Sequence, residues 1–557
     1  MKNQKASTQF KIMTNTPLIN VLRTRSAEAV FVLCACAAFT AAYAVWMGQD
    51  TNWDQKNYHF YTVHAWLTGR TFSDLAPAQI QTWLNPLPHL LQYLLIRTSP
   101  PLVAGLVMGA LAGLNGLMLW LLARRLQRGD PTWDGRACAC VIVLVGLTGS
   151  IFLSEVGTTF AEYLCSVLVL GGLISITPLS SEIAYNPKAR NFLFAGLWLG
   201  AACGLKLTNL IYAIGLGVSL LALWPVLALH GRMLLSYTIG GVCGFLATGG
   251  YWAVHLWLVF GNPIFPFFNA VFASPLFERV NFADAIFIPK SLLTAAITYP
   301  FAWLRGMYPT NQLPFREARF ALVAVFLPVA LVVSALRPAR GPSGAAETGS
   351  TVELRQFWLH GLFFVASYAI WLKQFGHQRY ALPLELLTGL LLFLSLDRIL
   401  RNRREITIVL GLLAVFIVIW TRPANWGRIP YGKDWFGIAA PRDTDPPTLY
   451  VMMGDGEPFS YVIPFMPQTS RFVRLTGNMP LEPSKPLGQE ALSMILAHTG
   501  TIRSLAVVEL NEQHRARLAR FGLALAPQGR CEQFRSHLDT FTTCVLTKIA
   551  PSGHPER

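Results

Sequence analysis

The sequence predicts an α-helical protein that crosses a membrane about eleven times and ends in a small soluble α/β domain. Of its 557 residues, 53% are apolar and 13% are charged, whereas soluble domains carry roughly 25% charged residues. Many apolar runs reach the ~20 residues with which a helix crosses a bilayer. A helix suits these runs because lipid cannot satisfy backbone polar groups. The end of the chain is by contrast polar, with alternating strand-like and helix-like segments.

The apolar runs place a membrane domain at 27–421, after an amino-terminal segment of 1–26. The expected spans are 27–47, 102–123, 137–154, 160–179, 191–206, 208–227, 234–259, 317–336, 356–373, 380–397 and 406–421. Two further apolar stretches, 83–97 and 288–304, are short and interrupted by proline. Runs of this length rarely span a bilayer, so we interpret both as interfacial or re-entrant helices.

The basic residues predict the orientation. The formal net charge of +16 would by itself suggest nucleic acid or anionic lipid as a partner. The charges instead gather in the first 26 residues and in the loops after the second and tenth spans, and no basic stripe with interleaved aromatics is present. The positive-inside rule makes that side cytoplasmic. We therefore expect a multi-pass inner-membrane protein with a cytoplasmic amino terminus, a periplasmic carboxyl-terminal domain and no nucleic-acid partner.

The carboxyl-terminal domain is expected at 422–557. The runs TLYVMM, YVIPF, RFVRL and SLAVVEL are typical of strands, and LGQEALSMILAHTG and NEQHRARLARFGLAL of helices. Seven of the nine cysteines lie in apolar spans. The other two, Cys531 and Cys544, could pair in an oxidising periplasm, and the alternative is two free thiols.

The candidate site residues lie in the segments that this topology assigns to the outer face. Two of these segments, 48–101 and 260–316, are long. The carboxylate candidates are Asp50, Asp54 and Glu155. The cationic candidates are Lys206, in GLKLTN, and Arg379, in KQFGHQRYALPLE, followed by Tyr380. Charged groups cost free energy inside a bilayer and tend to mark function.

Carboxylates beside fixed cations suit one kind of chemistry. The cations can hold an anionic leaving group such as a lipid phosphate, while a carboxylate removes the proton of an incoming hydroxyl. Structural interpretations stay open: Glu155 could end its span, Lys206 could reach to the interface and Arg379 could bind headgroups. No HExxH or other compact metal set is present. No cofactor is required, and a divalent metal is compatible but not indicated.

The stretch WDQKNYHFYTVHAWLTGR resembles the first outer loop of GT-C superfamily glycosyltransferases, in which an acidic residue follows the first span and a tyrosine comes four residues later. Those positions are Asp54 and Tyr58. GLKLTNLIYAIG, GNPIFPFFN and QRYALPLE are similar to other outer-loop signatures of bacterial members. The resemblance covers roughly 27–421, and its motifs are loose individually. It implies substrate-binding roles for Tyr58, His59, Asn85 and Asn262.

The resemblance implies a glycosyltransferase that uses a polyprenyl-phosphate sugar at the outer face of the cytoplasmic membrane. Asp54 would be the base in an inverting displacement, and Arg379, Lys206 and Tyr380 would bind the donor phosphate. Many members have a second acid directly after the first, where this chain has Gln55. Asp50 or Glu155 would have to supply that carboxylate. The acceptor would be an envelope glycan, lipid or protein.

Three alternatives stay open. A transporter or flippase of lipid-linked saccharides would share the many spans, although no internal repeat of the kind common in transporters is visible. A polysaccharide polymerase or ligase would differ mainly in its acceptor. A non-catalytic assembly or sensory protein would use the carboxyl-terminal domain as a binding module.

Overall fold

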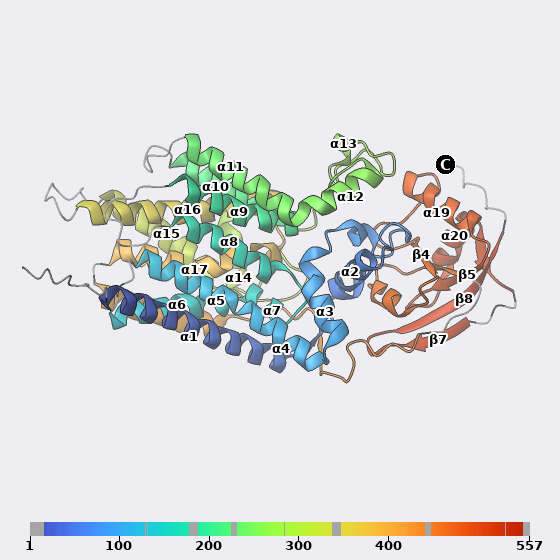
Figure 1. Cartoon of the computed structure of the whole chain (residues 1–557), viewed down its shortest axis with the longest axis horizontal. Coiled ribbons are helices and arrows are strands. Elements are labelled where there is room, and N and C mark those ends of the chain that lie inside the picture. The colour runs from blue at the N-terminus through green and yellow to red at the C-terminus, as the bar shows by residue number, and fades with distance from the viewer. Residues whose placement is uncertain are drawn as a thin grey trace, which may run out of the picture.

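The computed structural model describes residues 16–549, apart from 128, 129, 131, 178–187, 224–230, 283, 337–346, 401, 441–446, 528 and 530. A bundle of helices occupies one end of the long axis, and a sheet domain formed by the end of the chain occupies the other (Figure 1). The helical membrane class and the α/β character of the tail are both confirmed.

Each of the predicted spans contains helix. The bundle consists of α1 (Thr16–Met47), α4 (Pro101–Ala112), α5 (Leu114–Leu126), α6 (Trp133–Leu147), α7 (Ser150–Glu155), α8 (Glu162–Ile176), α9 (Ala189–Leu205), α10 (Leu210–Ala222), α11 (Gly231–Phe245), α12 (Tyr251–Phe260), α15 (Arg319–Leu336), α16 (Glu347–Gln374), α17 (Leu382–Ile399) and α18 (Arg403–Trp420). Within the described part of the chain, five helical stretches are long and apolar enough to cross a membrane: Ser26–Met47, Pro101–Leu126, Gly231–Phe260, Arg319–Leu336 and Gln378–Ile399.

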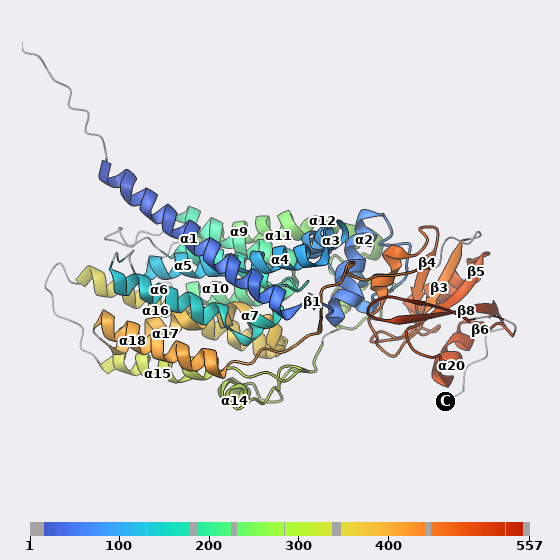
Figure 2. The ribbon, with the colours of Figure 1, turned by 90° about the horizontal axis from the view of Figure 1, so that it is seen from below.

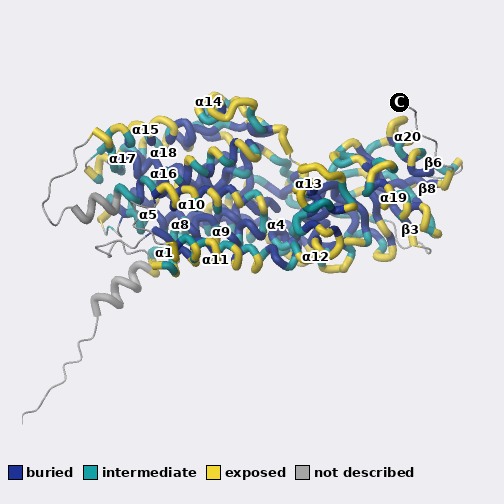
Figure 3. The backbone as a smooth tube through the Cα atoms, turned by 90° about the horizontal axis from the view of Figure 1, so that it is seen from above, coloured by how far each residue is buried: buried dark blue, intermediate teal, exposed yellow. Residues whose placement is uncertain are grey.

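Helix α17 forms the centre of the bundle. In its apolar stretch 89% of the positions are buried, whereas in that of α1 only 17% are. Helix α1 therefore lies at the edge of the bundle and faces outward. The leucine-rich sequence of α17 contacts α6, α15 and α16. Figure 3 shows the same gradient, with buried backbone inside the bundle and exposed positions along its outer helices.

Small residues allow α9 and α11 to pack closely. A Cβ atom added at Gly200 would collide with the carbonyl oxygen of Gly241, and one at Gly244 with that of Leu197. Glycine at such positions lets two membrane helices approach at backbone distance. Helix α11 continues through the π-helix η5 (Leu246–Gly250) into α12.

The first outer loop folds into short elements between the bundle and the sheet domain: β1 (Gln49–Asp50), η1 (Gln55–His59), α2 (Phe60–Leu67), η2 (Gln79–Trp83), η3 (Leu87–His89) and α3 (Leu90–Thr98). Figure 2 shows α2 and α3 in this position. The nine residues of α3 extend about 13 Å, well short of the ~30 Å of bilayer hydrocarbon. Helix α14 (Leu292–Leu304), with 13 residues and Pro300 inside, is also too short to cross the bilayer. Helix α13 (Asn269–Phe272) is shorter still.

The tail domain has a six-stranded mixed sheet in the order β4-β3-β5-β8-β6, with β7 paired to β8. Its strands are β3 (Thr448–Met452), β4 (Arg471–Arg474), β5 (Thr501–Leu505), β6 (Leu523–Leu525), β7 (Cys531–Arg535) and β8 (Thr540–Lys548). Strands β3, β4 and β5 are parallel to one another. Alternation along β3 puts Leu449 and Val451 in one hydrophobic cluster with α19 (Pro486–Ala497) and α20 (Glu512–Arg520).

Three details of the tail differ from the sequence prediction. YVIPF is not a strand but lies in the 3-10 helix η7 (Ser460–Phe465), where Pro464 lacks the N–H that a strand ladder needs. The strand expected in SLAVVEL begins earlier, at Thr501, and ends at Leu505. The expected helix NEQHRARLARFGLAL stops at Arg520, and Leu523–Leu525 forms β6.

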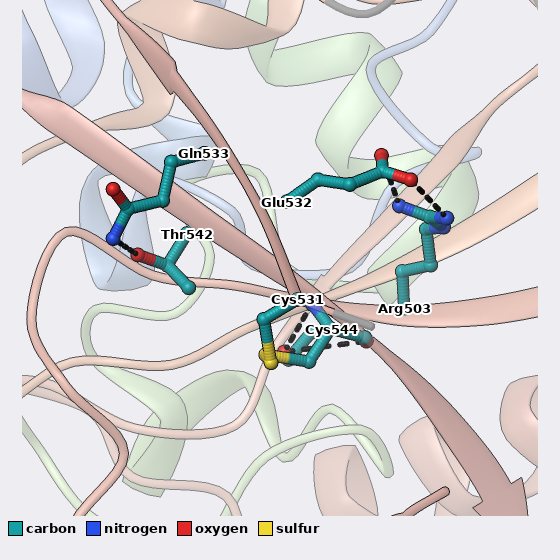
Figure 4. The surroundings of a disulfide bond; sticks show 7 residues. Arg503, Cys531, Glu532, Gln533, Thr542 and Cys544 are labelled. Atoms are coloured by element: carbon teal, nitrogen blue, oxygen red, sulfur yellow. Dashed lines mark hydrogen bonds and ion pairs between the residues drawn. A yellow bond between two sulfur atoms is a disulfide. The ribbon is translucent and has the colours of Figure 1, made fainter. Parts of the chain in front are cut away.

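Cys531 and Cys544 form a disulfide with an S–S distance of 2.09 Å. They face each other on the antiparallel strands β7 and β8. Figure 4 shows the surrounding polar contacts: Arg503 bonds to Glu532, and Gln533 donates to Thr542. The remaining cysteines of the described chain are free.

The first outer loop is built into the tail domain. Leu75 forms a parallel bridge with Val473 of β4, so the loop extends the edge of the sheet. Asp74 accepts from the N–H of Phe472, and Arg70 donates to the carbonyl oxygen of Ser470. At the start of the loop, β1 pairs with the short strand β2 (Arg428–Ile429). The tail therefore fixes the shape of the loop that contains Asp54.

Candidate active site

Four charged side chains meet where the first outer loop joins the helical bundle. Arg379 Nη1 lies 2.7 Å from Asp54 Oδ2, and Arg379 Nε lies 3.1 Å from Glu162 Oε1. Lys206 Nζ lies 2.6 Å from the same oxygen of Glu162. These side chains are 6–15% exposed. The fold thus brings together three of the predicted residues, Asp54, Lys206 and Arg379.

Each member of this cluster sits at the end of an element. Asp54 directly precedes η1, and Glu162 is the first residue of α8. Lys206 follows α9 in extended conformation, because the chain turns there into the 3-10 helix η4 (Leu207–Asn209). Arg379 lies in the 3-10 helix η6 (Gln378–Ala381), ahead of Pro383 in the first turn of α17. Turns at helix ends can direct polar side chains into a common space without placing them along the lipid-facing surface.

Aromatic rings surround the cations. The guanidinium carbon of Arg379 lies 4.2 Å from the ring centre of Phe160, 5.5 Å from that of Tyr380 and 5.7 Å from that of Trp426. Lys206 Nζ lies 5.2 Å from the ring centre of Tyr380. Cation–π contacts hold these charges in place, and the rings exclude water, which strengthens electrostatic attraction. Tyr380 therefore lines the cluster with its ring, and its backbone carbonyl accepts from the hydroxyl of Tyr212.

Glu155 is a buried carboxylate with no hydrogen-bond partner among the described residues. It ends α7, is 0% exposed, and neither carboxylate oxygen is bonded. One oxygen of Glu162, Oε2, is also unbonded. Buried polar atoms without partners are rare in native proteins and call for an explanation, such as a catalytic role or a bound group.

Asp50 does not have a free carboxylate. Its Oδ2 accepts from the N–H of Thr159 at 2.9 Å and from Thr159 Oγ1 at 3.1 Å, and both oxygens accept from Asn52 Nδ2. Burial raises the pKa of Asp50 above its ordinary value, and the nearby Arg428 guanidinium partly offsets the shift. The carboxylate of Asp50 thus ties β1 to the turn that precedes α8, and the catalytic role expected for Asp50 stays a prediction.

His59 and Tyr58 line the wall beside this turn. His59 Nδ1 lies 2.8 Å from Thr159 Oγ1, and its ring stacks on His89 at 3.8 Å between centres. His89 Nδ1 donates to the carbonyl oxygen of Thr159 at 3.1 Å. Burial lowers the pKa of His89 to about 3 and that of His59 well below its usual range. Both rings are therefore neutral near pH 7, and the ring of Tyr58 packs edge-on against them.

The side-chain amides of Asn85 and Asn262 bond within the protein, and the substrate-binding roles expected for both residues stay predictions. Asn85 Nδ2 donates to the carbonyl oxygens of Gly204 and Thr248, and its Oδ1 accepts from Tyr251 and from the N–H of Leu87. Asn262 is 0% exposed. Its amide bonds within its own turn, to Phe267, Asn269 and Ile264. The bonds of Asn85 use both donors and both acceptor positions of its amide, whereas Asn262 Oδ1 accepts from one N–H among the described residues.

The sequence prediction missed several members of the site. Glu162 ends the stretch SEVGTTFAE, which joins α7 to α8, and it is not among the predicted site residues, although it forms ion pairs with both cations. Thr159, His89, Phe160 and Trp426 were not named as candidates. Thr, Phe and Trp are ordinary residues in membrane loops, so the sequence alone does not mark them as members of a site. Only the fold shows that they converge.

No cluster of three or more His, Cys, Asp or Glu side chains with metal-binding geometry occurs in the described part of the chain. The cluster instead alternates carboxylates and cations, an arrangement that suits an anionic ligand. A phosphate could replace a carboxylate partner of Arg379 without any change in the sign of the charges.

No family model and no curated protein matches the sequence. Among solved structures, the fold is similar to the crystal structure of ArnT from Cupriavidus metallidurans bound to undecaprenyl phosphate, with a TM-score of 0.48 and 11% sequence identity. The match covers 94% of this chain and 99% of that chain.

Proposed function

We propose that this protein is a GT-C-type membrane glycosyltransferase that moves a sugar from a polyprenyl-phosphate donor to an envelope acceptor at the outer face of the cytoplasmic membrane. The observation that carries the proposal is the buried Asp54–Arg379–Glu162–Lys206 cluster. It combines a base and a phosphate-binding pair at the end of a membrane bundle, where a lipid-linked substrate would present its headgroup.

The donor phosphate would bind to Arg379 and Lys206. A guanidinium presents a planar fork that matches phosphate oxygens, and Lys206 adds a point charge. Glu162 forms ion pairs with both cations and would keep them oriented before the donor arrives. Tyr380 and Phe160 would shield the site from water, and the apolar bundle would accommodate the prenyl chain.

Donor binding would release the base. In the free protein, Arg379 Nη1 bonds to Asp54, and a carboxylate paired with a guanidinium is a poor proton acceptor. A phosphate that takes this position on Arg379 competes with Asp54 and frees its carboxylate. The base would therefore become active only when a donor is present.

The transfer would be an inverting displacement. The acceptor hydroxyl attacks the anomeric carbon from the face opposite the phosphate, and its proton passes to Asp54. The bond between the anomeric carbon and the phosphate oxygen breaks, and the electron pair leaves with the polyprenyl phosphate on Arg379 and Lys206. Glu155, whose two oxygens have no hydrogen-bond partner among the described residues, would receive hydroxyl groups of the bound sugar and supply the second carboxylate, in place of Gln55.

The decisive experiment uses purified full-length protein and a panel of radiolabelled polyprenyl-phosphate hexoses and pentoses, with extracted lipopolysaccharide, other cell-wall glycans and envelope proteins as acceptors. We expect label to pass from one lipid to one acceptor with inverted anomeric configuration, and Asp54→Asn to stop the transfer. The proposal fails if no donor is consumed while the protein moves a labelled lipid between vesicle leaflets, which would identify a flippase.

A further inference from the structure

A second set of charges lies inside the bundle, outside the cluster of Asp54 and Arg379. Glu317, Arg319 and Glu385 are each 0% exposed. Arg319 begins α15, and Glu385 lies in the first turn of α17. Arg319 Nη1 lies 2.7 Å from Glu317 Oε1. Three buried ionisable side chains are costly, and an apolar replacement would often be equally stable, so stability alone does not account for them.

These residues meet at the break between α6 and α7. The carboxylate of Glu385 accepts from the N–H of Ile151 at 2.9 Å and from that of Phe152 at 2.8 Å. The N–H of Ser150 donates to Glu317 Oε2 at 3.0 Å. The first three N–H groups of α7, which have no partner within the helix, are thus all bonded to two carboxylates.

Arg319 binds the end of α6, on the other side of the same break. Its Nε donates to the carbonyl oxygen of Val145 and its Nη2 to Thr148 Oγ1, each at 2.8 Å. A cation therefore lies at the carboxyl end of α6 and anions lie at the amino end of α7, as the dipoles of both helices favour. Gly149 is needed between them, because a Cβ atom there would collide with the carboxylate of Glu385.

Helix α7 links this break to the active site. Its last residue is Glu155, and the turn that follows contains Thr159 and Phe160. Gln378, the neighbour of Arg379, donates to Ser150 Oγ at 3.2 Å. The indole N–H of Trp426, whose ring lies beside Arg379, donates to Ser154 Oγ at 3.3 Å. A shift of α7 would therefore move residues on both sides of Arg379.

We infer that Glu317, Arg319 and Glu385 are positioning residues that fix the broken helix α6–α7, so that Glu155 and Phe160 face the substrate in the correct place. This inference rests on the proposed function for its effect on turnover. Its structural part, the control of the position of α7, does not depend on any activity.

The test combines a structural signal with kinetics. The full-length protein is labelled with 5-fluorotryptophan, and the ¹⁹F resonance of Trp426 is assigned by its loss in Trp426→Phe. Glu385→Gln keeps the shape of the side chain but places an amide NH₂ against N–H donors of α7. We expect it to move the Trp426 resonance and to lower kcat about 10- to 100-fold, the cost of a displacement of roughly 1 Å.

Affinity for a short-chain polyprenyl phosphate should change little in Glu385→Gln, because Arg379 and Lys206 remain. The matched control is Thr388→Val, on the same helix and equally buried, whose hydroxyl bonds only to the carbonyl oxygen of Glu385 among the described residues. It should leave the resonance and kcat as in the wild type. Ser150→Ala, which removes only a hydroxyl, is a second variant and should shift the resonance in the same direction.

The inference is overturned if Glu385→Gln and Ser150→Ala both leave the Trp426 resonance unmoved, or if Thr388→Val reproduces their effects. A moved resonance in a protein that transfers no sugar supports the positioning of α7 and removes the proposed function. A moved resonance with wild-type kcat shows that α7 does not position the reacting groups, and also overturns the inference.

Discussion

Arg379 Nη1 lies 2.7 Å from the carboxylate of Asp54, although 325 residues separate them in the sequence. Asp54 is held by the first outer loop, which the tail domain fixes, and Arg379 by the turn before the central helix α17. The pair therefore depends on three parts of the fold at once, and its two members are the most direct targets for mutation.

Asp54→Asn tests the base. We expect transfer to fall about 10²- to 10⁴-fold, the usual contribution of a general base. Binding of polyprenyl phosphate should become tighter, because the amide no longer competes with phosphate for Arg379. Turnover of a labelled donor and the equilibrium affinity for the unlabelled lipid phosphate would be measured together. Asp434→Asn, an exposed position, is the control and should change neither. Weaker lipid binding in Asp54→Asn would contradict the exchange of partners on Arg379.

Arg379→Lys tests the phosphate fork. The substitution keeps the charge but removes the guanidinium nitrogen that forms the ion pair with Glu162, and lysine cannot reproduce the planar geometry. We expect the affinity for polyprenyl phosphate to fall about tenfold, equal to the ~1.4 kcal/mol of one charge-assisted hydrogen bond. The exposed Arg305, changed to Lys, is the matched control. Equal affinities in the two variants would show that Arg379 does not bind the phosphate.

His89→Gln tests the buried histidine pair. The pKa of His89 is about 3 in the folded protein and about 6.5 in an unfolded chain. The unfolded state therefore binds more protons between these values, and stability falls as pH decreases below 6.5. His89 should contribute about 1.4 kcal/mol of this loss per pH unit.

Thermal unfolding in detergent at pH 7 and pH 5 measures this dependence. Glutamine can still donate to the carbonyl oxygen of Thr159 but does not titrate, so His89→Gln should lose less stability than the wild type between the two pH values. His537→Gln, at an exposed position of the tail, should behave like the wild type. An unchanged difference in His89→Gln would mean that this ring is not held neutral by burial.

Much of the helical arrangement could be predicted, because apolar runs of about 20 residues are typical of helices that cross a membrane, whether they face lipid or the centre of the bundle. The tail was harder: YVIPF alternates like a strand, but Pro464 and the packing against the first outer loop make it a 3-10 helix. Periodicity describes which residues are apolar and not which backbone bonds a proline removes.

The site could be predicted only in part, because a sequence shows which polar residues are present but not which bonds they form. Asp54, Lys206 and Arg379 are charged residues in unusual places, and such residues stand out in an apolar sequence. Asn85 and Asn262 also stood out, but their amides bond to the backbone of neighbouring turns. A sequence shows that a polar group is present, whereas only the fold shows whether its bonds are already used.

Glu155→Leu tests the unpaired carboxylate. Both oxygens of Glu155 are buried without a partner among the described residues, which costs a protein about 1–3 kcal/mol for each such group. Leucine has a similar volume and no polar atom, so the variant should unfold at a higher temperature than the wild type. Transfer should nevertheless fall, because the carboxylate that would receive the sugar is gone.

Ser219→Ala, which removes a buried hydroxyl of α10, controls for loss of a polar group elsewhere in the bundle. A variant that is less stable than the wild type and equally active would show that Glu155 has a structural partner and no role with substrate, whereas greater stability with lost activity is the pattern expected of a group retained for function.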